Sequence, residues 1–223
     1  MTPAAPRVFL ASRNRKKIQE MERILREHVP GLVVVGIDDV EHYDEPVEDQ
    51  PTFEGNALLK ARAGRAATGL PSLADDSGLC VDALNGMPGV LSARWAGPPT
   101  LRDASSLGSS GTDRSLRDDR DARNNELLLA QLSDVPDERR TAHFQCAVAF
   151  CHDGGEELTS GVMPGRVIHE TRGTGGFGYD VLFVADDRPG ATTAELSVED
   201  KDAISHRGWA LRRMAPIVAR VLR

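Results

Sequence analysis

Two adjacent carboxylates, Asp75 and Asp76, lie between two short apolar runs at residues 70–74 and 79–84. Neighbouring side chains of an extended segment point to opposite faces, so one aspartate can face a site while the other supports the structure. The aspartate pair is therefore a candidate general-base or metal-ligating position. Asp, Ser and Gly are also common turn residues, so an ordinary turn over residues 75–78 is the structural alternative.

The first apolar segment, residues 8–11, leads into a polar stretch at which a helix is expected to begin. A helix N-terminus offers unpaired amides and a positive dipole end to an anion, and Ser12, Asn14 and Lys17 add donors. This pattern predicts a phosphate-binding segment; a capped surface helix with solvated lysines is the alternative. The segment lacks the GxxxxGK[ST] pattern, which disfavours a nucleotide kinase or ATPase of that type.

Thr52 is expected to cap a second helix that runs to about residue 68. Asn56 and Lys60 lie four positions apart on it and share a face, from which Lys60 can reach a second phosphate. Glu48, just upstream, is a candidate magnesium ligand together with the aspartate pair, because Mg²⁺ prefers oxygen ligands. An exposed acidic loop is the alternative for Glu48.

Two further segments, residues 173–180 and 201–207, have residue types suited to ligand binding. The glycines of the first permit close approach of the backbone, and Phe177 or Tyr179 could cover a flat base. A tight connection between strands is the alternative. The second segment, which ends in Arg207, is rich in donors that suit a polar, multiply oxygenated ligand, whereas a solvated helix end is its alternative.

Apolar periodicity predicts the elements that position these residues. Strands are expected over residues 8–11, 32–35, 143–151, 162–168 and 181–184, and helices after residue 14, from 52, over 124–132 and from the Ser197 capping box to the C-terminus. Residues 98–123 are poor in large apolar side chains, so a mobile insertion without chemistry is expected there. The mingling of strands and helices predicts an α/β fold with a mixed β-sheet.

Composition narrows the class of protein. The 223 residues, of which 40% are hydrophobic, suffice for one sizeable core. The formal charge of -7 argues against a nucleic-acid partner, because such proteins usually carry a basic surface. No apolar run reaches the length of a membrane span and the start of the chain does not resemble a signal peptide, so a cytoplasmic location is expected. The three cysteines form no CxxC pair and are expected to be buried free thiols.

Several motifs, in this order, resemble the inosine triphosphate pyrophosphatase family, also called Ham1-like proteins. They are residues 9–17, TFEGNALLKA at 52–61, ADDSGL at 74–79, VDALNGMPGVLSARWAG at 81–97, GTGGFGYD at 173–180 and AELSVEDKDAISHRG at 194–208. The resemblance covers nearly the whole chain except residues 98–123, which look longer than the family's usual connection.

The resemblance implies hydrolysis of ITP, dITP or XTP between the α- and β-phosphates. The products are the nucleoside monophosphate and pyrophosphate, the cofactor is Mg²⁺, and the reaction removes these nucleotides from the pool. It also implies a homodimer whose subunit is a single domain over residues 1–223. That domain would contain an elongated mixed β-sheet flanked by helices, with a substrate cleft between two lobes.

The matched motifs also imply roles for individual residues. Asp76 is the implied proton acceptor and a metal ligand, and Glu48 is the implied second ligand, although its neighbours differ from the family's usual acidic-Thr-Gly sequence. The implied triphosphate contacts are Ser12, Arg13, Asn14, Arg15, Lys16, Lys17 and Lys60, and Ser77 also touches the substrate. The residues implied to surround the base are Phe177, Gly178, Tyr179, Asp180, Lys201, His206 and Arg207.

Elementary chemistry adds two hypotheses to this resemblance. An isolated aspartate, with a pKa of about 3.9, is a poor base, so we expect Asp76 to accept the proton of a water whose acidity a metal has raised. Arg207 has only donors, which suit the 6-oxo group of hypoxanthine or xanthine but not the amino group of adenine. This second argument does not explain how guanine would be rejected.

Two rival functions stay open at this point. One is a pyrophosphatase for other nucleotides, such as modified pyrimidines, on a related fold. The other is a nucleotide-binding protein that has lost catalysis, against which the presence of both Asp75 and Asp76 speaks.

Overall fold

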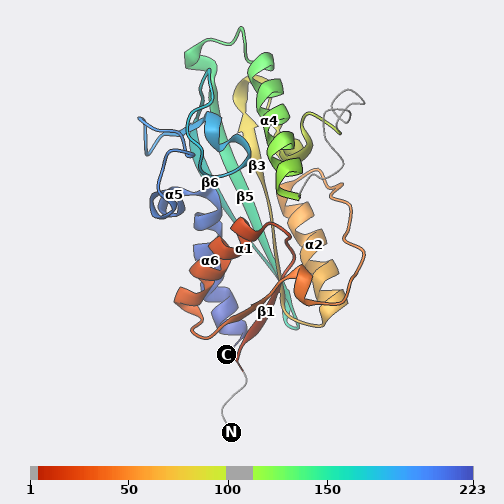
Figure 1. Cartoon of the computed structure of the whole chain (residues 1–223). Coiled ribbons are helices and arrows are strands. Elements are labelled where there is room, and N and C mark those ends of the chain that lie inside the picture. Colours follow the sequence, from red (N-terminus) through yellow and green to blue (C-terminus); the bar gives the residue numbers. More distant parts are fainter. Residues whose placement is uncertain (1–4, 99–112, 223) are drawn as a thin grey trace. The chain divides into compact units, whose positions relative to one another are not determined.

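The structure is a computed structural model that describes residues 5–98 and 113–222 (Figure 1). Its strands are β1 (Arg7–Leu10), β2 (Val33–Val35), β3 (Ser72–Val81), β4 (Met87–Pro88), β5 (Thr141–His152), β6 (Gly155–Val167) and β7 (Phe183–Ala185). Its α-helices are α1 (Arg15–His28), α2 (Phe53–Thr68), α4 (Asp113–Gln131), α5 (Val198–Ile204) and α6 (His206–Val221). Short 3-10 helices cover Ile37–Asp39, Asp82–Leu84, Gly89–Arg94, Asp137–Arg139 and Gly178–Leu182.

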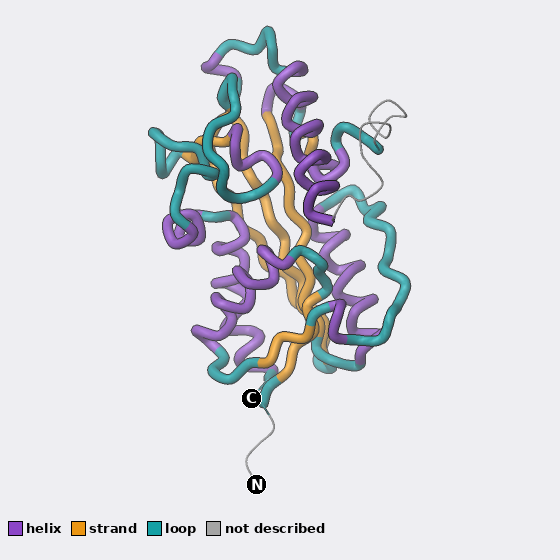
Figure 2. The backbone as a smooth tube through the Cα atoms, in the orientation of Figure 1, coloured by secondary structure: helices purple, strands orange, loops and turns teal. Residues whose placement is uncertain are grey.

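The sheet is mixed, which confirms the predicted α/β class. Its strand order is β2-β1-β3-β5-β6-β7, with β4 paired to β3 (Figure 2). β1 pairs in parallel with both β2 and β3, whereas β3 with β4 and β6 with β7 are antiparallel. None of the helices in the described ranges combines the length and apolar character needed to span a bilayer.

The chain divides into two compact units. The first comprises Met1–Ser77, Gln145–Val162 and Asp202–Arg223, and the second comprises Gly78–Phe144 and Met163–Lys201. The boundaries fall within β3, β5, β6 and α5, so these four elements contribute residues to both units. The two lobes that the resemblance implies and the single domain over the whole chain both stay predictions.

Helices α1 and α6 pack against each other in the first unit (Figure 1). The sequence predicts an apolar stripe of Ala210, Met214, Ile217 and Val221 on the last helix; the first two are fully buried and the last two are partly buried. Met21 and Leu25 of α1 are fully buried as well. These side chains join Val8 and other strand residues in one core cluster. Burial of such a stripe stabilises an amphipathic helix more than its intrinsic propensity does.

Helix α2 also belongs to the first unit, and a glycine in it permits the helix to approach the sheet closely. A Cβ atom added at Gly64 would lie 2.5 Å from the Phe9 ring and 2.7 Å from Ser72 Oγ. Asn56, Lys60 and Gly64 are spaced by four residues and therefore share a helix face. The predicted start of this helix is confirmed, because the Thr52 side chain accepts a hydrogen bond from Gly55 N.

Several predicted element boundaries are wrong. The strand expected over residues 162–168 begins at Gly155 as β6, and the strand expected over 181–184 begins only at Phe183 as β7. Helix α4 begins at Asp113 rather than at residue 124, so the described part of the expected insertion is helical; residues 99–112 lie outside the described ranges. Its polar sequence was taken for a loop, yet Arg and Ala favour helices, and Asp119 and Arg123 have the spacing of a stabilising pair. The C-terminal helix is divided, because Ser205 ends α5 and caps α6 by accepting the Gly208 N–H.

Candidate active site

The paired aspartates lie inside β3, so the alternative of an ordinary turn over residues 75–78 is wrong. The strand continues through Ser77 and Gly78 to Val81. Asp75 and Asp76 are nevertheless only 2% and 7% exposed. Buried charges persist only when they are paired, and each aspartate has its own partners on its own side of the strand.

Asp76 faces helix α2. Asn56 Nδ2 donates to Asp76 Oδ2 at 2.9 Å, and Lys60 Nζ lies 3.7 Å from Asp76 Oδ1. The same Lys60 ammonium contacts Glu48 Oε1 at 2.6 Å. Lys60 thus stands between the two carboxylates that the resemblance implies as metal ligands.

Burial raises the pKa of Asp76 above its usual range, and the negative charge of Glu48 raises it further, against the opposing effects of Lys60 and Asn56. Burial lowers the pKa of Lys60, but Asp75, Asp76 and Glu48 outweigh it and the net shift is upward. The site therefore joins a lysine that stays charged to a carboxylate with increased proton affinity. That proton affinity suits a general base better than the affinity of an exposed aspartate does.

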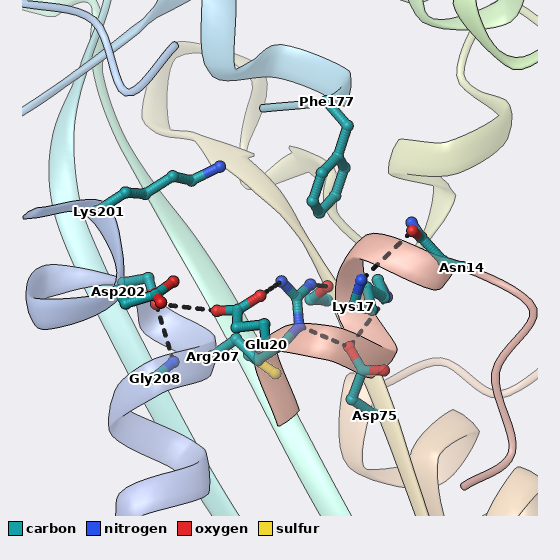
Figure 3. Close-up of polar contacts among 12 residues, drawn as sticks. Asn14, Lys17, Glu20, Asp75, Phe177, Lys201, Asp202, Arg207 and Gly208 are labelled. Carbon is teal, nitrogen blue, oxygen red and sulfur yellow. Dashed lines mark hydrogen bonds and ion pairs between the residues drawn. The ribbon is translucent and has the colours of Figure 1, made fainter. Parts of the chain in front are cut away.

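Asp75 faces helices α1 and α6 and is the centre of a buried charge cluster (Figure 3). Its Oδ2 atom accepts from Lys17 Nζ at 2.9 Å and from Arg207 Nε at 3.1 Å. The other guanidinium nitrogens of Arg207 donate to Glu20 Oε2 and to Ser77 Oγ, both at 2.9 Å. All three nitrogens of Arg207 are thus engaged within the first unit.

Opposing effects set the charge of Asp75. Burial raises its pKa, but Lys17, Arg207 and Lys60 outweigh burial and hold the pKa far below its usual range. Burial likewise opposes the charge of Arg207, but Glu20 and Asp75 raise the pKa of Arg207 above its usual value. Asp75 is therefore a permanent anion that holds Lys17 and Arg207 in place.

The polar segment at the start of α1 is capped internally. Asn14 Oδ1 accepts the Lys17 N–H at 3.4 Å, and Ser12 Oγ accepts the Asn14 N–H at 3.2 Å. Arg13 extends instead to an acidic loop, where its Nε atom lies 2.6 Å from Glu45 Oε1. The side chains of Arg15 and Lys16 lie outside what the structure describes.

The donor set around Lys60 fits a hard divalent cation. Within the described ranges no three His, Cys, Asp or Glu side chains gather as a metal site. Glu48 and Asp76 supply two carboxylates, both directed at one positive charge. Mg²⁺ is commonly held by one or two protein carboxylates, with phosphate and water oxygens completing its shell.

In the second unit, one buried carboxylate organises the glycine-rich loop, residues 173–180. Asp180 Oδ2 accepts the Phe177 N–H at 2.8 Å and also contacts the Lys201 ammonium, while its Oδ1 accepts from Thr193 Oγ1 at 2.8 Å. Gly176 has a φ of 68°, and a Cβ atom there would lie 2.1 Å from Asp180 Oδ2. Glycine is required at this position by both the backbone angle and the carboxylate.

The aromatic residues of this loop differ in their surroundings. Tyr179 is 4% exposed and donates through its hydroxyl to the Ser92 carbonyl oxygen at 3.0 Å, so this side chain is part of the core. Phe177 is half-buried, and Lys201 Nζ lies 5.1 Å from the centre of its ring. Of the two, Phe177 is the aromatic side chain that can still reach a ligand.

Some residues of the site were not assigned from the sequence. Glu20 follows Lys17 by one helical turn, and this spacing could have been noticed. Asn56 was placed on the correct face of α2 but given no partner. The sequence did not indicate that α4 contacts the glycine-rich loop. Asp121, which accepts the Gly178 N–H, lies in the segment expected to be an insertion.

The fold and the site define an α/β protein with a buried site in which carboxylates are paired with lysine and arginine side chains. The chain belongs to the Ham1 family, whose model matches residues 8–217. It is 51% identical to the dITP/XTP pyrophosphatase of Mycolicibacterium paratuberculosis, over 97% of each chain. It is 54% identical to the protein of the same name from Nocardia farcinica, over 96% of this chain and 95% of the relative.

Solved structures agree with this membership. A HAM1 protein from Coxiella burnetii superposes with a TM-score of 0.78 at 35% identity, covering 96% of this chain and 99% of that protein. The nucleoside-triphosphatase, or dITP/XTP pyrophosphatase, of Mycobacterium abscessus gives a TM-score of 0.69 at 45% identity, with coverage of 94% and 99%.

Proposed function

We propose that this protein hydrolyses the non-canonical purine nucleotides ITP, dITP and XTP to the nucleoside monophosphate and pyrophosphate, clearing them from the nucleotide pool. The observation that carries this proposal is the buried Asp76, placed with Asn56, Lys60 and Glu48 in a chain of the Ham1 family. Relatives at about half identity that bear the name dITP/XTP pyrophosphatase support the substrate class.

Asp76 is the proposed proton acceptor. A water oxygen attacks phosphorus, the bridging oxygen between the α- and β-phosphates leaves with pyrophosphate, and the water proton passes to the Asp76 carboxylate. The raised pKa of Asp76, caused first by burial, increases its affinity for that proton. Asn56 orients the carboxylate, because its amide donates to one of the two oxygens.

Lys60 and Lys17 are the proposed charge-neutralising groups. A triphosphate repels an incoming nucleophile unless positive charge is placed against it beforehand. Lys60 keeps its charge through Asp75, Asp76 and Glu48, and Lys17 is held by Asp75. The amides at the start of α1 add further donors to this end of the site.

Magnesium is the proposed cofactor, with Asp76 and Glu48 as its protein ligands. When bound, the ion would neutralise phosphate charge and orient the reacting oxygens. Glu48 is 31% exposed and so is open to an ion entering from solvent. Lys60 would then exchange a carboxylate for a phosphate oxygen as its partner.

The base is the proposed ligand of the glycine-rich loop, with Phe177, Gly178 and Lys201 as the contacting groups. Tyr179 and Asp180 would act through the loop that they hold in shape. His206 and Arg207 stay proposed base contacts by resemblance. Because all three nitrogens of Arg207 donate to Asp75, Glu20 and Ser77, recognition of a 6-oxo group by Arg207 would require one of these bonds to exchange.

A homodimer and a cytoplasmic location complete the proposal. The dimer follows from the family resemblance. Sedimentation of the purified protein would test the dimer directly.

A substrate panel tests the function. ITP, dITP, XTP, GTP and ATP are incubated with the protein, with and without Mg²⁺, and the products are separated. We expect monophosphate and pyrophosphate from the first three in the presence of Mg²⁺. Preference for a modified pyrimidine triphosphate in the same assay would favour the first rival, and saturable ITP binding without pyrophosphate would favour the second.

A further inference from the structure

We infer that Asp121 and Asn125 of α4 are positioning residues for nucleotide recognition, because they fix the backbone of the glycine-rich loop at Gly178. The inference rests on the proposed function, in which this loop contacts the base. It gives a role to a helix that begins inside the segment expected from the sequence to lack chemistry.

Both backbone groups of Gly178 are bound by α4. Asp121 Oδ2 accepts the Gly178 N–H at 2.8 Å, and Asn125 Nδ2 donates to the Gly178 carbonyl oxygen at 3.0 Å. Asp121 and Asn125 are four residues apart and therefore lie on one face of the helix. Two hydrogen bonds to one residue define the orientation of the peptides on either side of it.

Gly178, the residue that α4 binds, directly follows Phe177, so its backbone conformation affects the direction of the Phe177 side chain. Gly178 has a φ of 62°, a left-handed conformation that glycine adopts about as readily as others, so its two hydrogen bonds to α4 select this conformation from several open to it. The preceding N–H, that of Phe177, is bound by Asp180. Consecutive amides of the loop are thus bound by two different carboxylates, Asp180 from within the loop and Asp121 from outside it.

The helix is itself anchored to the rest of the second unit. Asn124 Oδ1 accepts the Ala96 N–H at 2.8 Å, and Asn124 Nδ2 donates to the Ser92 carbonyl oxygen at 3.2 Å. The same Ser92 oxygen accepts the Tyr179 hydroxyl. The loop and the helix therefore share an acceptor, and a helix fixed in this way can hold Gly178 in a constant place.

The test compares Asp121→Ala with Asp121→Asn and with the control Asp119→Ala, which removes an exposed carboxylate two positions away on the same helix. Hydrogen exchange of the loop amides is measured without nucleotide. We expect Asp121→Ala to accelerate exchange at Gly178 at least tenfold, because that N–H loses its acceptor. Asp121→Asn retains an acceptor oxygen and should restore most of the protection.

Steady-state kinetics then distinguish a positioning role of Asp121 from a general loss of structure. Removal of one charge-assisted hydrogen bond is expected to raise the KM for ITP about tenfold in Asp121→Ala, with kcat within about threefold of the wild type. Binding of inorganic triphosphate, which has no base, should be unchanged. Asn125→Ala should shift the KM in the same direction by a smaller factor.

Several results would overturn the inference. They are unchanged exchange at Gly178, equal weakening of ITP and inorganic triphosphate binding, or the same KM shift in Asp119→Ala. The hydrogen-exchange measurement needs no enzymatic activity, so it tests whether α4 fixes the loop even if the wild type fails to hydrolyse ITP. That failure would refute the proposed function instead.

Discussion

The β3 site and the glycine-rich loop each depend on a buried aspartate, but the two aspartates bind different kinds of donor. Asp75 accepts from the side-chain cations Lys17 and Arg207. Asp180 accepts from a backbone N–H, a hydroxyl and Lys201. In the first unit the carboxylate fixes the positions of charges, whereas in the second it fixes the path of the chain.

This difference predicts different responses to mutation. In the charge cluster, removal of one partner leaves another charge buried and unpaired, so the cost is electrostatic. In the loop, removal of an acceptor frees a backbone conformation, so the cost is seen in loop dynamics and in ligand affinity.

Asp76→Asn is expected to reduce kcat for ITP by about a thousandfold, within the range for removal of a general base. The asparagine still offers Asn56 an acceptor, so the Kd for ITP should stay within about threefold. Steady-state turnover and equilibrium binding measure the two effects separately. Retained turnover would show that Asp76 is not the proton acceptor.

Asp75→Ala should lower the free energy of unfolding by about 3–5 kcal/mol, because Lys17 and Arg207 lose their shared counter-charge in a buried site. Glu27→Ala, at an exposed position on the same helix as Lys17, is the control. Urea denaturation measures both variants. A loss below about 1 kcal/mol would mean that Glu20 alone compensates the two cations.

Two glycine variants sharpen the description of the loop. Gly176→Ala and Gly178→Ala both impose a side chain on a left-handed residue, at a cost of about 1–2 kcal/mol. Only the former places a Cβ against Asp180, since the space at Gly178 is open. Gly176→Ala should therefore be the less stable of the two in urea, and equal stabilities would contradict the role given to Asp180.

Arg13→Ala should leave the urea midpoint unchanged. Its ion pairs with Glu45 and Asp38 are solvent-exposed, and such pairs contribute little to stability. If Arg13 contacts the triphosphate, the KM for ITP rises in this variant although stability does not. A clear fall in the midpoint would contradict the expectation that exposed ion pairs, unlike buried ones, contribute little to stability.

Local signals explain which parts of the fold could be predicted. The Thr52 cap and the end of α2 at Thr68 depend on nearby residues only, and both were located correctly. The course of β3 could not be predicted in this way. Arg207, which compensates Asp75, is 132 positions away in the sequence, so the residues 75–78 resemble a turn when they are considered alone.

The candidate site also contains some features that could be predicted from the sequence and others that could not. Sequence motifs indicated Asp76, Lys60 and Glu48, and the structure brings these three side chains together. The partners of Arg207 could not be predicted, because its side chain suits a ligand and a buried carboxylate equally well. The three cysteines are free and buried, as expected, and burial raises the pKa of the Cys80 thiol to about 11.

The identity of the products formed from ITP tests the central claim most directly. The wild-type protein is incubated with ITP and Mg²⁺ in ¹⁸O-labelled water, and the products are analysed by mass spectrometry. We predict IMP and pyrophosphate, with one ¹⁸O atom incorporated into IMP per turnover, and near-complete loss of both products in Asp76→Asn. Formation of IDP and phosphate would contradict the account, because the bond cleaved would then lie between the β- and γ-phosphates.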